Sequence, residues 1–320
     1  MIDETRSYAR KVFRAKQHLD EIKAELAGYE GRHPYVAVRD RNTDPNPRVW
    51  TYRAHLAKKP SPDIALMVGD VVHNLRTALD YVVAELVPLN RRRKCKFPVI
   101  HSDILATDPQ TGEYLDRSEG AAILRNDFTS AVFGMDTDAA AFIYSLQPGK
   151  APYDASTHPL AILSALDDAD KHCELITVTL GIKDPEATLN YRNQFDLILK
   201  ADPPGTVVEE GGIVAQFIIR PRELKTYITD QGMVDMVIAA LADGNAKVGV
   251  KITGEPQVAV KLRGVQGKVA EIPGAIEDLG AFVWEDVLVT LDWYVDIAEG
   301  KRLPSAELPP EIRVHRVSPP

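Results

Sequence analysis

The spacing of the apolar residues changes along the chain, and this change constrains the fold more than any other feature. Over residues 3–27, 63–87 and 275–299 the apolar residues recur at the three- and four-residue spacing of an amphipathic helix. Over residues 35–56 and most of 174–268 they alternate with polar residues, as in a strand with one buried face. The strands do not alternate with long helices, so a doubly wound parallel sheet is disfavoured. We predict an α+β fold in which a helical layer or bundle is built from both ends of the chain and a largely antiparallel β-section is inserted before the last helix.

Shorter patterns and turn residues complete this prediction. A β-hairpin is expected over residues 35–56, because the turn-forming stretch Asn42-Thr43-Asp44-Pro45-Asn46-Pro47 separates its two runs. Gly211-Gly212 and Gly254-Glu255-Pro256 are expected to be the turns of two more hairpins. Further helices are expected at about 116–133, 138–147 and 159–173, with a short one at 234–242.

These elements predict three parts of the chain. Residues 1–173 and 275–300 are expected to form a helical domain that includes the hairpin near 35–56. Residues 174–268 are expected to form a β-rich section, and the proline-rich residues 304–320 an extended tail. Whether the hairpin pairs with the β-rich section is left open.

Composition excludes several classes of protein. Hydrophobic residues make up 45% of the 320 residues and the formal net charge is -8, which disfavours broad, charge-driven binding to nucleic acid. Two cysteines do not make a disulfide scaffold. No apolar run approaches the roughly 20 residues of a membrane span, and residues 1–20 have a charged helical pattern unlike a signal peptide. We expect a cytoplasmic protein with no membrane partner, and leave self-association into a homodimer open.

The helix expected at 63–87 carries an unusual polar stripe. At about 100° per residue, Asp70, His73, Arg76, Thr77 and Asp80 fall on one side and the apolar residues on the other. A solvated helix face usually carries lysine and glutamate, and this stripe has neither. We therefore favour a buried polar network, functional or structural, over an ordinary exposed face.

The stripe combines residue types that suit an anion. Arg76 can hold a carboxylate or phosphate through two hydrogen bonds, with Asp80 four residues later to orient it. His73 can exchange a proton near neutral pH. Asp170, in the helix expected at 159–173, falls on an apolar flank and needs a donor, which Arg76 or His73 could supply. Two other pairs of that helix are expected to be surface ion pairs, namely Asp167 with Lys171 and Asp168 with His172.

The stripe also carries a resemblance. Gly69-Asp70-Val71-Val72-His73-Asn74-Leu75-Arg76-Thr77-Ala78-Leu79-Asp80 resembles the GD-x-x-HNLR-x-x-LD helix of a poorly characterised bacterial and phage-borne family. Phe97-Pro98-Val99, Leu146-Gln147-Pro148, His158-Pro159-Leu160 and Asp170-Lys171-His172 continue the resemblance in register. It implies no settled activity. The site residues that it implies are His73, Asn74, Arg76, Asp80, Asp170, Lys171 and His172.

Other chemistries fit less well. A metal site of His73, Asp80, Asp170 and His172 is disfavoured because Arg76 would repel a cation, so no metal and no cofactor is expected. Small helical HEPN-type ribonucleases pair an arginine with a histidine, with four to six residues between the two. Only Arg48 and His55 meet that spacing here, in a segment expected to be a strand, so this likeness is a weak analogy.

A basic run follows the same helix and includes Arg91, Arg92 and Arg93. Cations after a helix C-terminus complement its dipole, which is the ordinary explanation for such a run. The functional alternative is a loop that contacts phosphate, in RNA or in a nucleotide.

Three functional hypotheses follow. The first is binding of an anionic small molecule or nucleotide in a pocket, with His73, Arg76, Asp80, Asp170 and His172 as the candidate reactive residues. In that pocket Asn74, Lys171, Arg91, Arg92 and Arg93 would be the ligand contacts. The second is a metal-independent phosphodiesterase or ribonuclease that uses His73 as acid or base and Arg76 to stabilise charge. The third is a non-enzymatic structural or interaction protein whose polar motif locks two helices together.

Overall fold

The computed structural model describes residues 2–40, 49–101, 126–150, 154–172, 175–190, 195–196, 206–218, 220–221, 249–262 and 269–302. It confirms the α+β class, with long helices and antiparallel strand pairs. The chain forms two compact units. The helical unit comprises residues 1–22, 65–176 and 262–320, and the β unit comprises residues 23–64 and 177–261.

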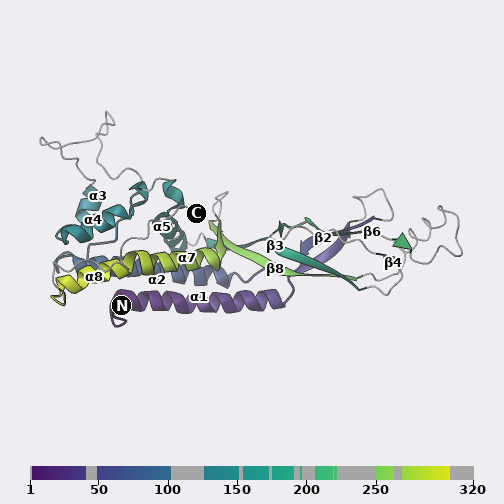
Figure 1. Cartoon of the computed structure of the whole chain (residues 1–320), viewed down its shortest axis with the longest axis horizontal. Helices are drawn as coiled ribbons and strands as arrows, with labels where there is room; N and C mark the ends of the chain where they lie inside the picture. Colours follow the sequence, from purple (N-terminus) through teal and green to yellow (C-terminus); the bar gives the residue numbers. More distant parts are fainter. Residues whose placement is uncertain are drawn as a thin grey trace, which may run out of the picture. The chain divides into compact units, whose positions relative to one another are not determined.

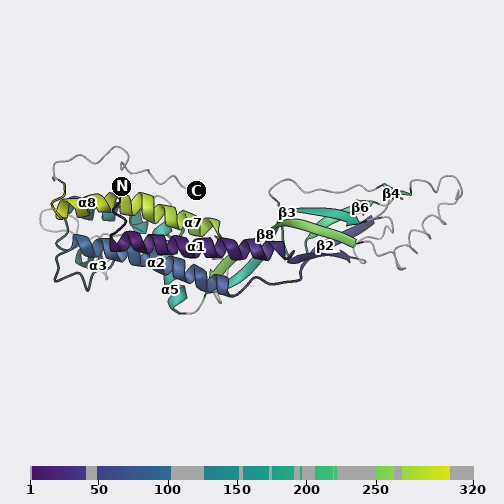
Figure 2. The same ribbon diagram turned by 90° about the horizontal axis from the view of Figure 1, so that it is seen from below.

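Three long helical segments lie side by side in the helical unit (Figures 1 and 2). They are the first part of α1 (Ser7–Gly31), most of α2 (Asp63–Leu86), and the segment at the C-terminal end. This last segment is nearly continuous and comprises α7 (Gly274–Ala281), a π-helical stretch (Phe282–Leu288) and α8 (Val289–Ala298). The helix expected at 275–299 is thus confirmed, whereas its central π-helical turn had no sequence signal.

The apolar side of α2 is buried, as its periodicity predicts. Each of six apolar side chains at helical spacing is at most 7% exposed: Val68, Val71, Leu75, Leu79, Val82 and Leu86. Burial of one such side chain is worth about 1.5–3 kcal/mol, so this side holds α2 in the core of the helical unit. Helix α1 runs on beyond residue 27, the end of the expected helix, to Gly31, because Tyr29 is fully buried in the additional turn.

Shorter helices complete the helical unit. They are α3 (Asn126–Ala131), α4 (Thr137–Ser145) and α5 (Pro159–Lys171), with 3-10 turns at Pro148–Lys150 and Ala155–Thr157. Side chains cap two of their N-termini: Asp136 accepts from the first backbone N–H groups of α4, and His158 accepts from that of Leu160 in α5. These helices match the predictions, except that residues 116–125 lie outside the described part.

In the β unit the expected hairpin is confirmed and gains a third strand. Strand β1 (Tyr35–Asp40) is antiparallel to β2 (Val49–Leu56), and β6 (Ile213–Ile218) pairs with the other edge of β2. The hairpin therefore pairs with a strand from the 174–268 section and lies in the β unit, not with the helices. The physical reason is that Trp50 and Tyr52 bury their rings on the sheet face that β6 extends.

A second sheet has the strand order β5-β3-β8-β9. Its strands are β3 (Leu175–Asn190), β5 (Val207–Val208), β8 (Gly249–Leu262) and β9 (Val269–Ile272), and a separate pair joins β4 (Phe195–Asp196) to β7 (Arg220–Pro221). One apolar core in the β unit contains residues from both sheets: Tyr35, Trp50, Tyr52, Ala54, Ile182, Val208, Val214, Ala215 and Ile252. These sheets therefore pack face to face.

Two of the expected hairpins are wrong. Gly254 is not in a turn but lies inside the single strand β8, where its φ is +152° and an added Cβ would come within 2.8 Å of Ile182 Cγ1. Gly211-Gly212 does lie in a turn, but β5 and β6 on either side of it belong to different sheets. Glycine marks positions where the backbone can bend or approach closely, and it does not determine which strands pair.

Some predictions fall outside the described residues. These are the helix at 234–242 and the tail at 304–320. Within the described helices, none combines the length and the apolar character that crossing a membrane requires.

Candidate functional site

The polar stripe of α2 divides between two neighbours. Asp70 and His73, toward the start of the helix, face α5. Arg76 and Asp80, one turn and two turns further on, contact the segment after α2. The predicted site residues therefore do not form one cluster around Arg76.

Helix α5 comes very close to α2 at Gly69. A Cβ placed on Gly69 would lie 1.9 Å from Oδ1 of Asp170, so only glycine leaves room for this carboxylate. Burial raises the pKa of Asp170, and the neighbouring charges of Asp70 and Asp167 raise it further. The charge of His73 lowers the pKa of Asp170. The expected pairing of these two side chains is therefore present only as an electrostatic effect.

His73 instead pairs with Asp167, at 3.4 Å between Nδ1 and Oδ1. The Asp167 side chain is only 3% exposed and also forms an ion pair with Lys171, so the expectation of a surface pair is wrong for this carboxylate. The reason is that the α5 edge carrying Asp167 packs toward α2. Asp168 and His172 are exposed, and His172 ends α5.

Arg76 and Asp80 together hold the main chain of Phe97. Nη2 of Arg76 donates to the Phe97 carbonyl at 2.7 Å, and the Phe97 N–H donates to Oδ1 of Asp80 at 2.8 Å. The two side chains also form an ion pair at 3.4 Å. Since both polar groups of one buried residue are satisfied, the segment after α2 is fixed to the helix at this point.

The same segment is fixed a second time at Ile100. The Ile100 N–H donates to Oε1 of Gln147 at 3.0 Å, and the Gly149 N–H donates to the Ile100 carbonyl at 2.8 Å. Gln147 is 1% exposed. The sequence motifs around Arg76, Phe97 and Gln147 are thus brought together by contacts with one another.

Asn74 is committed to the helix packing. Its Nδ2 donates to the Asp70 carbonyl at 2.7 Å, and its Oδ1 accepts from Lys11 Nζ of α1 at 3.3 Å. Asn74 is 8% exposed, so it is a contact between α1 and α2.

We call the contact of Arg76 and Asp80 with the main chain of Phe97 the Arg76 clamp. A cavity of about 500 Å³ adjoins it. Four cationic side chains line it: Arg76, Arg91, Lys94 and Lys96. Asp127, Ser130 and Cys95 also line it, and its apolar wall is formed by Val87, Phe97, Pro98, Val99, Ile100 and Ala131. Nη1 of Arg76 is buried and has no hydrogen-bond partner within the described residues.

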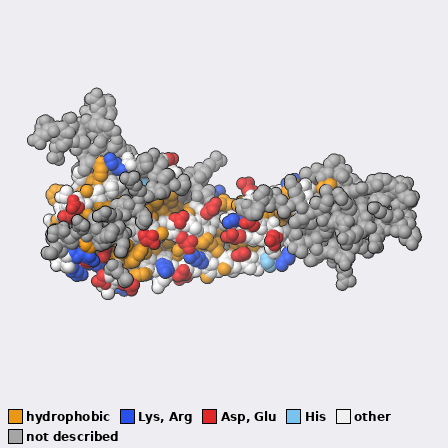
Figure 3. Space-filling model, in the orientation of Figure 1, with side chains coloured by type: hydrophobic (Ala, Val, Ile, Leu, Met, Phe, Trp, Pro, Cys, Tyr) orange, Lys and Arg blue, Asp and Glu red, His pale blue; other side chains and the backbone are white. Residues whose placement is uncertain are grey.

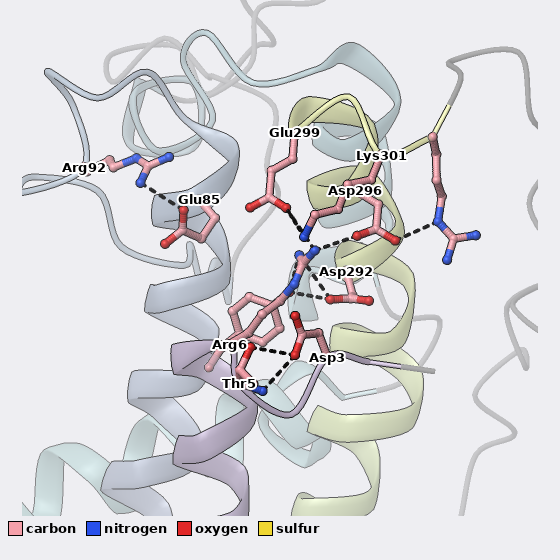
Figure 4. Close-up of polar contacts among 11 residues, drawn as sticks. Asp3, Thr5, Arg6, Glu85, Arg92, Asp292, Asp296, Glu299 and Lys301 are labelled. Carbon is pink, nitrogen blue, oxygen red and sulfur yellow. Dashed lines mark hydrogen bonds and ion pairs between the residues drawn. The ribbon is translucent and has the colours of Figure 1, made fainter.

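The three arginines of the basic run after α2 differ in their contacts. Arg91 donates to the Ser130 carbonyl at 3.1 Å, and its guanidinium lies 4.8 Å from the ring centre of Phe133. Arg92 pairs with Glu85 at 2.9 Å on the last turns of α2 (Figure 4). Arg93 is exposed and is not among the described residues that line the cavity. Phe133 had no signal as a site residue, because only the fold brings it to the run.

Cys95 also lines the cavity, but it is not an activated thiol. Burial raises the pKa of Cys95, and the effect of the cations Arg91 and Arg92 is smaller. The neutral thiol donates to the Arg92 carbonyl at 3.2 Å.

A second polar network, without a sequence signal, joins the start of α1 to the end of α8 (Figure 4). Arg6 contacts three carboxylates: Asp292 at 3.2 Å, Asp296 at 2.5 Å and Glu299 at 3.2 Å. The fully buried Tyr8 donates to Asp292 at 2.5 Å, and burial raises the pKa of both groups. This network is a structural link between the two ends of the described chain.

On the visible face of the helical unit, acidic, basic and apolar side chains are interspersed (Figure 3). Within the described residues, no three His, Cys, Asp or Glu side chains are arranged to hold a metal ion. Comparison with models of protein families, with curated proteins and with solved structures found no match. The family resemblance of the α2 motif therefore stays a prediction.

Proposed function

We propose that this chain binds an anionic small molecule or nucleotide in the cavity beside the Arg76 clamp. The observation that carries the proposal is the buried Nη1 of Arg76, which has no partner among the described residues. A buried donor on a charged group costs more than about 1–3 kcal/mol when it is unpaired. An anionic oxygen at this position would satisfy it with a charge-assisted hydrogen bond.

The charge of the lining supports the same ligand class. The described lining carries the cations Arg76, Arg91, Lys94 and Lys96 and a single carboxylate, Asp127. A cavity of about 500 Å³ is in the usual range for a small-molecule site, and its apolar wall lowers the local dielectric. The overall charge of -8 does not oppose this local excess, because solvent and salt screen charges more than about 10 Å away.

The ribonuclease hypothesis receives less support. It requires His73 and Arg76 to act on the same phosphodiester. His73 pairs with Asp167, and it is not among the described residues that line the cavity. We therefore propose binding without a catalytic role for His73.

The structural hypothesis is favoured by one specific observation, the clamp on the Phe97 peptide. Arg76 and Asp80 satisfy both of its polar groups, so they would hold the cavity wall in place with or without a ligand. The two hypotheses are compatible, since Nη2 of Arg76 makes the clamp and Nη1 has no hydrogen-bond partner in the part of the chain that the structure describes.

Isothermal titration calorimetry with inorganic phosphate and with adenosine monophosphate tests the proposal. Lys94→Ala is the test variant, because Lys94 lines the cavity and is exposed enough to be replaced without unfolding. Arg93→Ala is its matched control: it removes the same charge from the adjacent, exposed position that does not line the cavity. Loss of one charge-assisted contact of about 1.5 kcal/mol predicts roughly tenfold weaker binding for Lys94→Ala.

The proposal requires that Arg93→Ala change the affinity much less. Equal losses in both variants would indicate general charge attraction and not a site. If the wild-type protein binds neither probe, the anion site is refuted and the clamp alone remains as the role of the motif.

A further inference from the structure

Phe133 is exposed beside the cationic cavity. It lies two residues after α3, and 62% of its surface is exposed, which is unusual for a phenylalanine. The basic run supplies no exposed aromatic of its own, because Phe97 is 1% exposed and holds the cavity wall. The fold therefore adds an aromatic surface to a cationic loop.

Arg91 connects the ring to the cavity. Its guanidinium lies 4.8 Å from the centre of the Phe133 ring, and the same side chain lines the cavity. Its hydrogen bond to the Ser130 carbonyl holds the guanidinium over the ring. The Phe133 ring thus lies against a side chain of the cavity lining, next to the cavity and not in its lining.

The position of Phe133 is fixed by the turn that follows it. Gly134 has a φ of +79°, which disfavours any residue with a side chain. An added Cβ would also lie 2.7 Å from Cγ of Pro88, so the turn after α3 packs closely on the residues after α2. Ring and basic run are thus held next to each other by the backbone.

We propose that this surface binds single-stranded nucleic acid, with a phosphate in the cavity and a base stacked on Phe133. The proposal rests on the anion site proposed above and names its ligand class. Aromatic rings beside a cationic groove are the usual means of holding single strands, because every base has a flat face for stacking. A duplex keeps its base faces covered, and an acidic peptide would use the cations but not the ring.

Fluorescence anisotropy with labelled oligouridylate and oligothymidylate of equal length tests this inference on the full chain, and measures any preference for the 2′-hydroxyl. Phe133→Ala should weaken binding roughly 5- to 150-fold, the range for loss of one stacked base. Leu89→Ala is the matched control, because Leu89 is 79% exposed near the same basic run and has no ring. Phe133→Trp should retain the affinity.

Three results would overturn the inference. They are equal losses in Phe133→Ala and Leu89→Ala, displacement of the oligonucleotide by polyglutamate of the same charge, and oligonucleotide binding no tighter than that of inorganic phosphate. If phosphate still binds and its affinity still depends on Lys94, the anion site survives while the nucleic-acid inference fails. If phosphate does not bind either, both fail.

Discussion

Replacement of Gly69 by alanine tests the packing on which the candidate site depends. Gly69 is inside α2, and the ideal position of an added Cβ lies 1.9 Å from Oδ1 and 2.5 Å from Cγ of Asp170. Carbon atoms in contact are separated by about 3.5–4.0 Å, so this carboxylate cannot stay where it is. Helix α5 or the Asp170 side chain has to move.

Two opposing contributions determine the result. Alanine is favoured over glycine inside a helix by about 1 kcal/mol. Overpacking costs about 1–3 kcal/mol, and the lower part of this range applies to a side chain that can rotate away. The free energy of unfolding should therefore fall by up to about 2 kcal/mol in Gly69→Ala. Gly280→Ala, also in the helical unit and with no atom within 4 Å of its added Cβ, should raise it by about 1 kcal/mol.

Urea denaturation followed by circular dichroism measures both variants, and a double-mutant cycle isolates the contact. Asp170→Ala removes the atoms that a Cβ on Gly69 would meet, so Gly69→Ala should become stabilising in that background. A coupling free energy of roughly 1–3 kcal/mol is expected between the two positions. If Gly69→Ala stabilises the wild-type chain as much as Gly280→Ala does, helices α2 and α5 do not approach as described and the reasoning is refuted.

Two further predictions concern buried charge. Because the pKa of Asp170 is raised in the folded protein, its protonated form favours folding, and that stability is lost as the pH rises through the raised pKa. Asp170→Asn should therefore raise the urea midpoint at pH 7. It should not raise the midpoint below pH 3.8, the ordinary pKa of this carboxyl group. Asp168→Asn, at an exposed position, is the control and should change the midpoint little at either pH. Tyr8→Phe removes the hydroxyl that donates to the buried Asp292 and should lower the free energy of unfolding by about 1–3 kcal/mol in thermal denaturation; an unchanged stability would show that the hydrogen bond contributes nothing.

Periodicity was the reliable part of the sequence, because it reports which face of an element is buried and not what covers that face. The apolar side of α2 is buried as its periodicity predicts, and Trp50, Tyr52 and Ala54 of β2 are buried on one face, but Thr51 between them is buried as well. Turn residues were less informative: Gly254 lies within a strand because its backbone passes close to Ile182. Such a close approach is a tertiary contact, and the local sequence of β8 does not contain it.

The candidate site shows the same division. The residue types of the stripe indicated a buried polar network, and Arg76 and Asp80 do make one, whereas Asp70 and His73 are exposed. Their partner is the main chain of Phe97, which a side-chain pattern cannot reveal because every residue offers the same backbone groups. Asp167 was expected at the surface because a helical wheel describes one helix alone, and burial depends on the neighbouring helix.

The sequence by itself determined the α+β class, the amphipathic faces and the residue types available for an anion, since these depend on local spacing and side-chain chemistry. Only the tertiary structure decided which of them meet. It separated His73 from the cavity that Arg76 lines, and it brought Phe133 to Arg91 across about 40 residues of chain. The physical reason is that a polar side chain takes its final partner from whatever the packing of apolar faces places beside it, and that packing is a property of the whole fold.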